Sequence, residues 1–332
     1  MTTQDTAKTV LGKKRALPSS FLFGGTQFTT MTTANKILAA TWALALCLAL
    51  RAQPMQPLAP GQIGLSLSTT STLSGDTKLG DGNVTYKNIG IYNSSWALNQ
   101  RIGLGGQRNL TIGLDYDVTD IEGKEDAKFP LPGLLQSLGS SVKYLQPIDR
   151  QWMLSASIGA GSQVTDTGLL SDGWGMRASA VSIYNRSPQL TLVFGLAYNS
   201  LSQDLKLLPV FGCDWRPTEQ WSFAFGFPKT GATYKLNKQI ALGLAVSGAG
   251  GAFYVKDDPL PGVAPRSLAD SRLQYLEVRL GFNCDWKINN TFRVTGTVGQ
   301  VLYRQFKYID RDYKLKSRDT VPFVSLSGTI SL

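Results

Sequence analysis

The chain has 332 residues with a net charge of +10, and charged residues make up 17% of it, below the roughly 25% of an average soluble domain. It contains no histidine, which excludes Ser-His-Asp hydrolases, His-bearing zinc sites and histidine-based acid–base catalysis. A mean hydropathy of −0.07 excludes a helical membrane protein but suits a barrel, whose apolar residues alternate with polar ones.

The positive charge is not arranged as a nucleic-acid-binding surface. Residues 1–52 hold six basic residues and one acidic residue, so about half of the net charge lies there, and the rest is scattered without a basic run. Because nucleic-acid binding needs a clustered basic face, we expect no nucleic-acid partner. No nucleotide loop, metal-ligand spacing or catalytic triad appears, so we expect no enzymatic activity, cofactor or metal.

The N-terminal residues consist of a predicted leader and a predicted export signal. Residues 1–30 are polar and patternless, and we expect them to be disordered or untranslated, because Met31 is a second candidate start. After Met31, Lys36 supplies a positive region and Ile37–Leu50 an apolar run. That run is shorter than the roughly 20 residues of a transmembrane helix. This order predicts a secretory signal peptide at 31–52, and a membrane anchor is the alternative.

Residues 53–332 form the predicted barrel domain. In Phe211–Phe227, two runs of alternating apolar and small or polar residues flank the polar turn at 217–220, which predicts two antiparallel strands. A similar unit recurs at Leu280–Thr297, with the same Cys-Asp-Trp before its turn. Repetition of this unit predicts an all-β fold, a closed antiparallel transmembrane β-barrel of about 14 strands, within roughly 12 to 16.

The connections between strands are of two kinds. Short turns carry polar, Gly or Pro residues, at Gly105–Gln107, Pro147–Arg150, Asn185–Pro188, Arg216–Gln220, Asn237–Lys238 and Ile288–Asn290. Longer links are expected at Ser71–Asn83, Thr119–Pro132, Thr165–Asp172, Lys256–Asp270 and Tyr308–Asp319. Short turns on one rim and long loops on the other are typical of outer-membrane barrels, whose short turns are periplasmic.

The two faces of the predicted strands differ in polarity. In Tyr275–Lys287, large apolar side chains share one side and charged or polar side chains the other, which suits lipid outside and a wet lumen inside. A soluble exported β-sandwich is the alternative, but several strands exceed the five or six residues typical of sandwiches. Aromatic residues beside the short turns predict an interfacial girdle: Trp152, Trp215, Trp221, Trp286 and Phe292.

Charged residues on the inward side of the strands are the candidate functional residues. They would set a field on passing solutes if the lumen is open, or pair as structural plugs if it is filled. These putative lumen-lining charges are Asp115, Asp117, Lys143, Lys206, Glu277, Arg279, Asp285 and Arg293. We therefore expect a passive channel or transport-related barrel for small solutes. The alternative is a non-conducting structural or adhesive barrel whose loops Thr119–Pro132 and Lys256–Asp270 bind a partner.

Three segments resemble a known family. Leu208–Trp215, Trp221–Phe227 and Gly231–Val255 are similar to an uncharacterised family of exported bacterial outer-membrane β-barrels, defined as a domain of unknown function. The resemblance covers most of residues 60–332 and implies the fold and an outer-membrane location, with lipid as surroundings, but no activity. The last segment, Pro322–Leu332, resembles the signal that the barrel-assembly machinery reads.

The Gly-rich run Gly248–Gly251 falls inside the third of these segments. It lacks the lysine and the following helix of a phosphate-binding loop. We expect it to permit bending or close packing of a strand in the barrel wall.

Overall fold

The structure, a computed structural model, describes residues 60–81, 84–123, 129–165, 171–201, 206–226, 229–261 and 267–332. The expected leader at 1–30 and signal peptide at 31–52 lie outside the described residues. Within these ranges no helix is long and apolar enough to span a bilayer.

The described residues fold into strands joined by turns, with one short 3-10 helix. The elements are β1 (Ile63–Gly80), β2 (Thr85–Gly105), β3 (Arg108–Gly123), β4 (Leu134–Pro147), β5 (Trp152–Thr165), β6 (Trp174–Ser187), β7 (Leu190–Asn199), β8 (Leu207–Trp215), β9 (Trp221–Gly226), β10 (Lys229–Lys235), β11 (Ile240–Val255), β12 (Ser271–Lys287), β13 (Phe292–Tyr308), η1 (Ile309–Arg311), β14 (Tyr313–Ser317) and β15 (Val321–Ser331).

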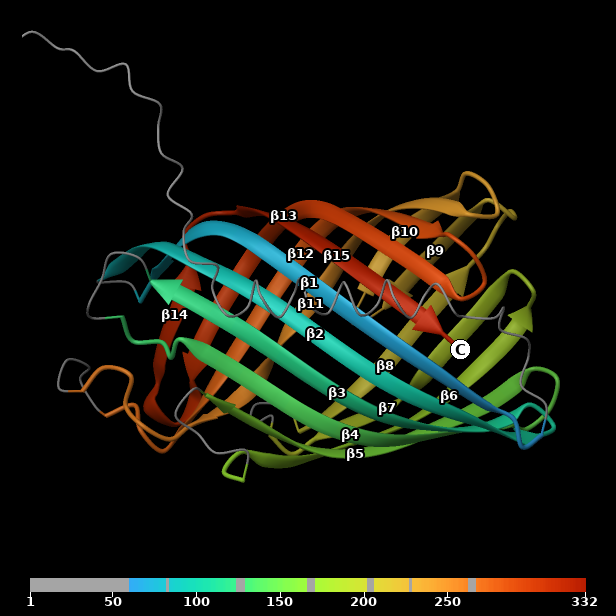
Figure 1. Cartoon of the computed structure of the whole chain (residues 1–332), viewed down its shortest axis with the longest axis horizontal. Coiled ribbons are helices and arrows are strands. Elements are labelled where there is room, and N and C mark those ends of the chain that lie inside the picture. The colour runs from blue at the N-terminus through green and yellow to red at the C-terminus, as the bar shows by residue number, and fades with distance from the viewer. Residues whose placement is uncertain are drawn as a thin grey trace, which may run out of the picture. The chain divides into compact units, whose positions relative to one another are not determined.

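These strands form one antiparallel sheet that closes on itself (Figure 1). Neighbours pair in sequence order from β1 to β13, and β15 pairs with both β13 and β1. The short β14 pairs with the same two strands, at the end of β1 near Gly80 and the end of β13 near Tyr308. Together β14 and β15 therefore fill one position in the wall. Fifteen strands therefore occupy fourteen positions, and the predicted barrel of about 14 strands is confirmed.

The outer face of the barrel is apolar. Large apolar side chains such as Leu114, Ile158, Leu196, Phe211 and Phe282 point away from the lumen and are exposed, which is the reverse of a soluble domain. A band of this kind around a closed sheet is the lipid-facing surface of a transmembrane β-barrel. The short turns join β2 to β3, β4 to β5 and their successors at one end, which is periplasmic by the same rule.

Two expected loops contain strands instead. The link expected at Tyr308–Asp319 holds η1 and β14, and the other is Ser71–Asn83. The sequence analysis placed a long link at Ser71–Asn83, whereas β1 continues to Gly80. The Ser, Thr and Gly residues of this segment favour a loop locally. Pairing with β2, β15 and β14 overrides that preference, and Leu79 near its end is fully buried.

The wall is not equally tall all the way round. β1 and β2 have 18 and 21 residues, whereas β8, β9 and β10 have nine, six and seven. Beyond the short strands, β5 and β11 approach each other, and Tyr254 pairs with Val164 in parallel orientation. The external end is therefore a narrower ring that leaves out β6 to β10.

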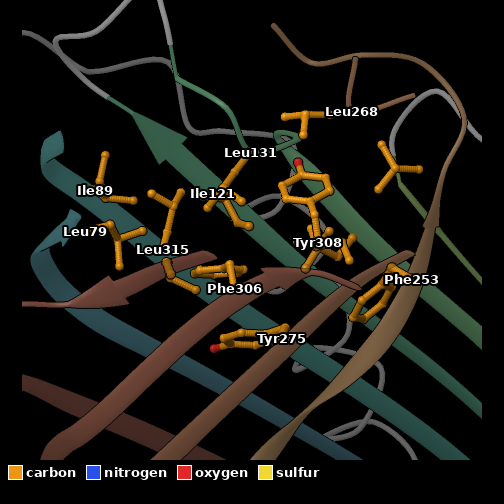
Figure 2. Packing of buried hydrophobic residues seen from close by; sticks show 14 of the residues in the cluster. Leu79, Ile89, Ile121, Leu131, Phe253, Leu268, Tyr275, Phe306, Tyr308 and Leu315 are labelled. Carbon is orange, nitrogen blue, oxygen red and sulfur yellow. The ribbon is translucent and has the colours of Figure 1, made fainter. Parts of the chain in front are cut away.

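Apolar side chains fill this narrower ring (Figure 2). Figure 2 shows Leu79, Ile121, Phe253, Phe306 and Tyr308 pointing toward one another from opposite walls. We call this set the apolar cluster; its buried members are Leu79, Tyr86, Ile89, Ile91, Ile121, Leu131, Leu135, Phe253, Val255, Leu268, Leu273, Tyr275, Phe306, Tyr308 and Leu315. It closes the axial route through the barrel at the external end.

The close packing expected of the Gly-rich run is present at Gly250 in β11. Its φ is +139°, a value that L side chains rarely adopt, and an added Cβ would lie 2.1 Å from the carbonyl oxygen of Tyr275. We expect Gly250→Ala to lower the free energy of unfolding by about 1–3 kcal/mol, the usual cost of such backbone strain. Urea unfolding in detergent micelles would measure this. Gly296→Ala is the control, because its added Cβ meets nothing within 4 Å; equal losses for both would contradict the prediction.

Candidate functional site

The first two candidate charges lie on the inner face of β3. Asp115 accepts a hydrogen bond from Arg177 of β6, whose Nη2 lies 3.2 Å from its Oδ2. The pair spans β4 and β5 above Gly139, where an added Cβ would lie 2.3 Å from the Arg177 nitrogen. Asp117 lines the same region of the lumen. Arg177 was missed by the sequence analysis, although it alternates with the small residues Gly175 and Ser179 on the inner side of β6.

Glu277 and Arg279 of β12 lie beside Arg304 of β13, directly below the apolar cluster. We call these three residues the ion cluster. Glu277 is fully buried and accepts hydrogen bonds from Tyr275, from Arg279 and from Arg304 Nε, the last at 2.6 Å. Arg304 Nη2 donates to Ser74 Oγ at 2.9 Å. Burial of the Glu277 carboxylate and the Arg304 guanidinium requires this pairing, while Arg279 stays partly exposed to the lumen.

Arg304 of β13 is the second functional residue that the sequence analysis missed. Strict alternation from the inward-facing Arg293 would place residue 304 on the lipid side. A β-bulge intervenes, since Arg279 pairs with Val301 while its neighbour Val278 pairs with Tyr303. The extra residue reverses the facing of the rest of the strand, so Arg304 points inward. Alternation in the sequence carries no signal for a bulge of this kind.

The four remaining candidate charges lie toward the periplasmic half or at a strand end. Lys143 lies on the inner side of β4 and is exposed to the wet lumen. Asp285 and Arg293 form a partly exposed ion pair at 3.5 Å. Lys206 precedes β8 instead of lying in a strand, and its carbonyl accepts the Asn199 backbone hydrogen bond. In the ranges that the structure describes, the His, Cys, Asp and Glu residues form no group of three suited to a metal ion.

Three cavities follow one another along the inner face of β12. A cavity of about 500 Å³ at the periplasmic mouth includes Lys287 and shares Asp285 with a lower lumen cavity of about 270 Å³. The lower cavity shares Arg279 with an upper lumen cavity of about 300 Å³, which ends against Phe253 and Tyr275 of the apolar cluster. Asp285 and Arg279, which each line two of these cavities, place the three in succession between the periplasmic mouth and the base of the apolar cluster.

Four of the five aromatic candidates are tryptophans beside the short turns, and the fifth, Phe292, is buried. Trp215, Trp221 and Trp286 point outward beside the short turns and are 45%, 43% and 48% exposed. Trp152 packs on Tyr184 of the neighbouring strand with ring centroids 4.6 Å apart. Phe292 departs from the expected girdle: it is 8% exposed and packs with Ile288, Val294 and Ile330 where β13 meets β15. Contacts across that strand pair cover it, which strand position alone does not predict.

Two external links contribute to the interior of the barrel. Leu131, between β3 and β4, and Leu268, between β11 and β12, are buried members of the apolar cluster. Tyr308 Oη donates a hydrogen bond to the carbonyl of Pro130 at 2.7 Å. The described parts of these links thus hold the external closure in place.

Residues 99–319, which are 221 of the 332 residues, match a family described as "Domain of unknown function (DUF6268)". No curated protein matches the chain. Among solved structures, it is similar to the COG4313 outer membrane channel from Pseudomonas putida F1, at 12% identity and a TM-score of 0.44, covering 85% of this chain and 100% of that one.

Two further solved structures are similar to the chain. One is the Pseudomonas putida toluene transporter TodX, at 11% identity and a TM-score of 0.39, covering 82% of this chain and 90% of that one. The other is a Pseudomonas aeruginosa FadL homologue, at 9% identity and a TM-score of 0.40, covering 81% and 89%. At such scores, any solute must be argued from this chain's own residues.

Proposed function

The chain belongs to the DUF6268 family, and we propose that it acts as a passive outer-membrane channel for small solutes. The observation that carries the proposal is the succession of three cavities along β12, which share Asp285 and Arg279. A barrel with a purely structural interior would fill this space with side chains. Here the lining includes many small or polar residues, among them Thr295, Thr297 and Ser325.

The charges along these cavities suit passage better than a complete plug. Asp285 and Arg293 are partly exposed, and Lys143 faces the lumen without being buried. Groups of this kind keep the lower lumen hydrated and act on a solute through their field. Full burial is reached only in the ion cluster, where Glu277 and Arg304 are both inaccessible.

The adhesive alternative is less well supported by the external links. Leu131 and Leu268 are committed to the apolar cluster, and the carbonyl of Pro130 accepts the hydrogen bond from Tyr308. These groups stabilise the closure of the barrel and are not presented to a partner. We propose a role without catalysis, because the chain has no histidine and no recognisable catalytic constellation.

The route to the membrane is part of the proposal. The apolar run within residues 31–52 would act as a cleavable signal peptide for export. The barrel-assembly machinery would insert the strands, and lipid would surround the apolar outer face. We propose small solutes as ligands and no nucleic acid, because the inward charges are of both signs.

Solute entry into intact Gram-negative cells tests the proposal. Cells with and without the barrel would be compared for initial uptake of N-phenyl-1-naphthylamine, an apolar fluorescent probe, and of ribose, a polar sugar. We expect a severalfold faster rate for at least one solute, and a low rate for ribose because the apolar cluster closes the axial route. Heat-modifiable gel mobility of the barrel would confirm that it is folded. Uptake equal to that of barrel-free cells for both solutes would refute channel function.

A further inference from the structure

The barrel wall has a gap beside the short strands, which we call the wall gap. β10 pairs with β11 only as far as Ser247, and β9 pairs with β8 only from Gly212. Within the described residues, 207–211 of β8 and 248–253 of β11 therefore have no neighbouring strand on these facing sides, apart from the β5 contact farther along β11. Six residues of β11 correspond to a gap of roughly 20 Å along the strand.

The upper border of the wall gap is tied across. Tyr254 of β11 pairs with Val164 of β5, and Lys256 Nζ lies 3.3 Å from the carboxylate of Asp172 in the link after β5. Tyr254 Oη also donates to Asp270 at 2.7 Å. The gap is thus a bounded window in the wall below the closed external ring.

Two cavities border the wall gap. A side cavity of about 370 Å³ lies between β6 and β11. Its lining includes the apolar Trp174, Leu201, Ala252 and Phe253 and the charged Asp172, Asp270, Arg272 and Asp310. Phe253 also lines the upper lumen cavity, together with Ala249. Phe253 therefore borders both the upper lumen cavity and the side cavity.

The wall gap lies at the depth of the lipid-facing band. Gly248 and Gly250 at its edge are register partners of Val278 and Leu276, two outward apolar residues of β12. Phe211, on the β8 edge, is 67% exposed. Backbone groups left unpaired at this depth are tolerated only where they are buried in protein or line a water-filled cavity. Ala249, Gly250 and Gly251 at the β11 edge line the upper lumen cavity, which meets that requirement for this edge.

We propose that small apolar solutes exchange between the lumen and the surrounding lipid through the wall gap, past Phe253. This inference rests on the proposed channel function and names its solute class and route. The apolar cluster closes the axial route, and Trp174, Leu201 and Phe253 give the side cavity apolar surface beside its charged residues. A sugar gains nothing from entering lipid, whereas an apolar molecule gains about 25 cal/mol per Å² of surface removed from water.

Large side chains placed at the wall gap, away from the ion cluster, test this route. Ala252→Trp would place an indole in the side cavity, and Ala249→Trp would place one in the upper lumen cavity beside the gap. Ala156→Trp is the matched control, since Ala156 faces outward on β5 between Tyr144 and Ala180, away from the gap. Each variant would first be shown to be folded by its heat-modifiable mobility. Uptake of N-phenyl-1-naphthylamine would then be measured as above.

We expect both window variants to lose most of the uptake that the barrel adds, and Ala156→Trp to keep it. Phe253→Ala should raise uptake, because it removes a side chain that borders both cavities. Uptake that the barrel raises but that neither folded window variant lowers would overturn the lateral route and leave channel function intact. A barrel that raises no uptake would instead refute channel function itself.

Discussion

Glu277→Ala should destabilise the barrel by about 3–5 kcal/mol, because it leaves the buried Arg304 without its carboxylate partner. Glu277 is fully buried and accepts hydrogen bonds from Tyr275, Arg279 and Arg304. Removing it strands the guanidinium of Arg304, which is also inaccessible to solvent. The midpoint of urea unfolding, followed by gel mobility or tryptophan fluorescence in lipid or detergent, would measure the loss.

The same strand supplies the control for this prediction. Asp285 also faces inward on β12 and pairs with Arg293 at 3.5 Å, but both side chains are partly exposed, 33% and 57%. Asp285→Ala should cost at most about 1 kcal/mol, as for most solvent-exposed ion pairs. The double variant Glu277→Met/Arg304→Met should recover part of the stability, because it removes both fully buried charges and leaves Arg279 partly exposed and bonded to Asn93. Similar losses for Glu277→Ala and Asp285→Ala would show that the ion cluster is not a buried network.

Phe306→Ala should open the external end of the barrel. Phe306 is fully buried in the apolar cluster and stacks on Tyr275 with ring centroids 4.8 Å apart. Truncating it leaves a cavity and should cost about 3–5 kcal/mol of stability. The cavity would also connect the upper lumen cavity, which Tyr275 lines, toward the external surface. We therefore expect faster ribose entry in liposome swelling than for the unaltered barrel.

Phe282→Ala is the control for this prediction, because it also removes an aromatic ring but does so outside the lumen. Phe282 lies on the outer face of β12 and is 47% exposed toward lipid. Its truncation should leave ribose entry unchanged, since it creates no space in the lumen. Unchanged ribose entry in a folded Phe306→Ala barrel would contradict the role of the apolar cluster as the axial closure.

Much of the fold was predictable because a β-strand exposes alternate residues on opposite faces. The alternation in Tyr275–Lys287 indicated the lipid side and the lumen side of β12, and the inward positions of Glu277, Arg279 and Asp285 follow from it. The expected loop at Ser71–Asn83 was wrong, because pairing with three other strands outweighed the local preference of its Ser, Thr and Gly residues.

The candidate site was predictable only in part. The sequence indicated charges on the inner face, but not that Glu277 and Arg279 would be joined by Arg304 in the ion cluster. A bulge opposite Val278 and Arg279 turns Arg304 inward, and periodicity cannot show where a bulge interrupts it. Arg177 likewise meets Asp115 only because the curvature of the wall brings β3 and β6 together across the small Gly139.

The sequence by itself determined a closed barrel with an apolar outer face, a polar inner face and short periplasmic turns, because these follow from local alternation and turn chemistry. Only the tertiary structure decided that apolar residues from distant strands close the external end, and that β11 meets β5 at Tyr254 and Val164 above the short strands. Both features depend on which strands meet across the barrel. That pairing is set by the relative heights of strands far apart in the chain, and local periodicity carries no information about it.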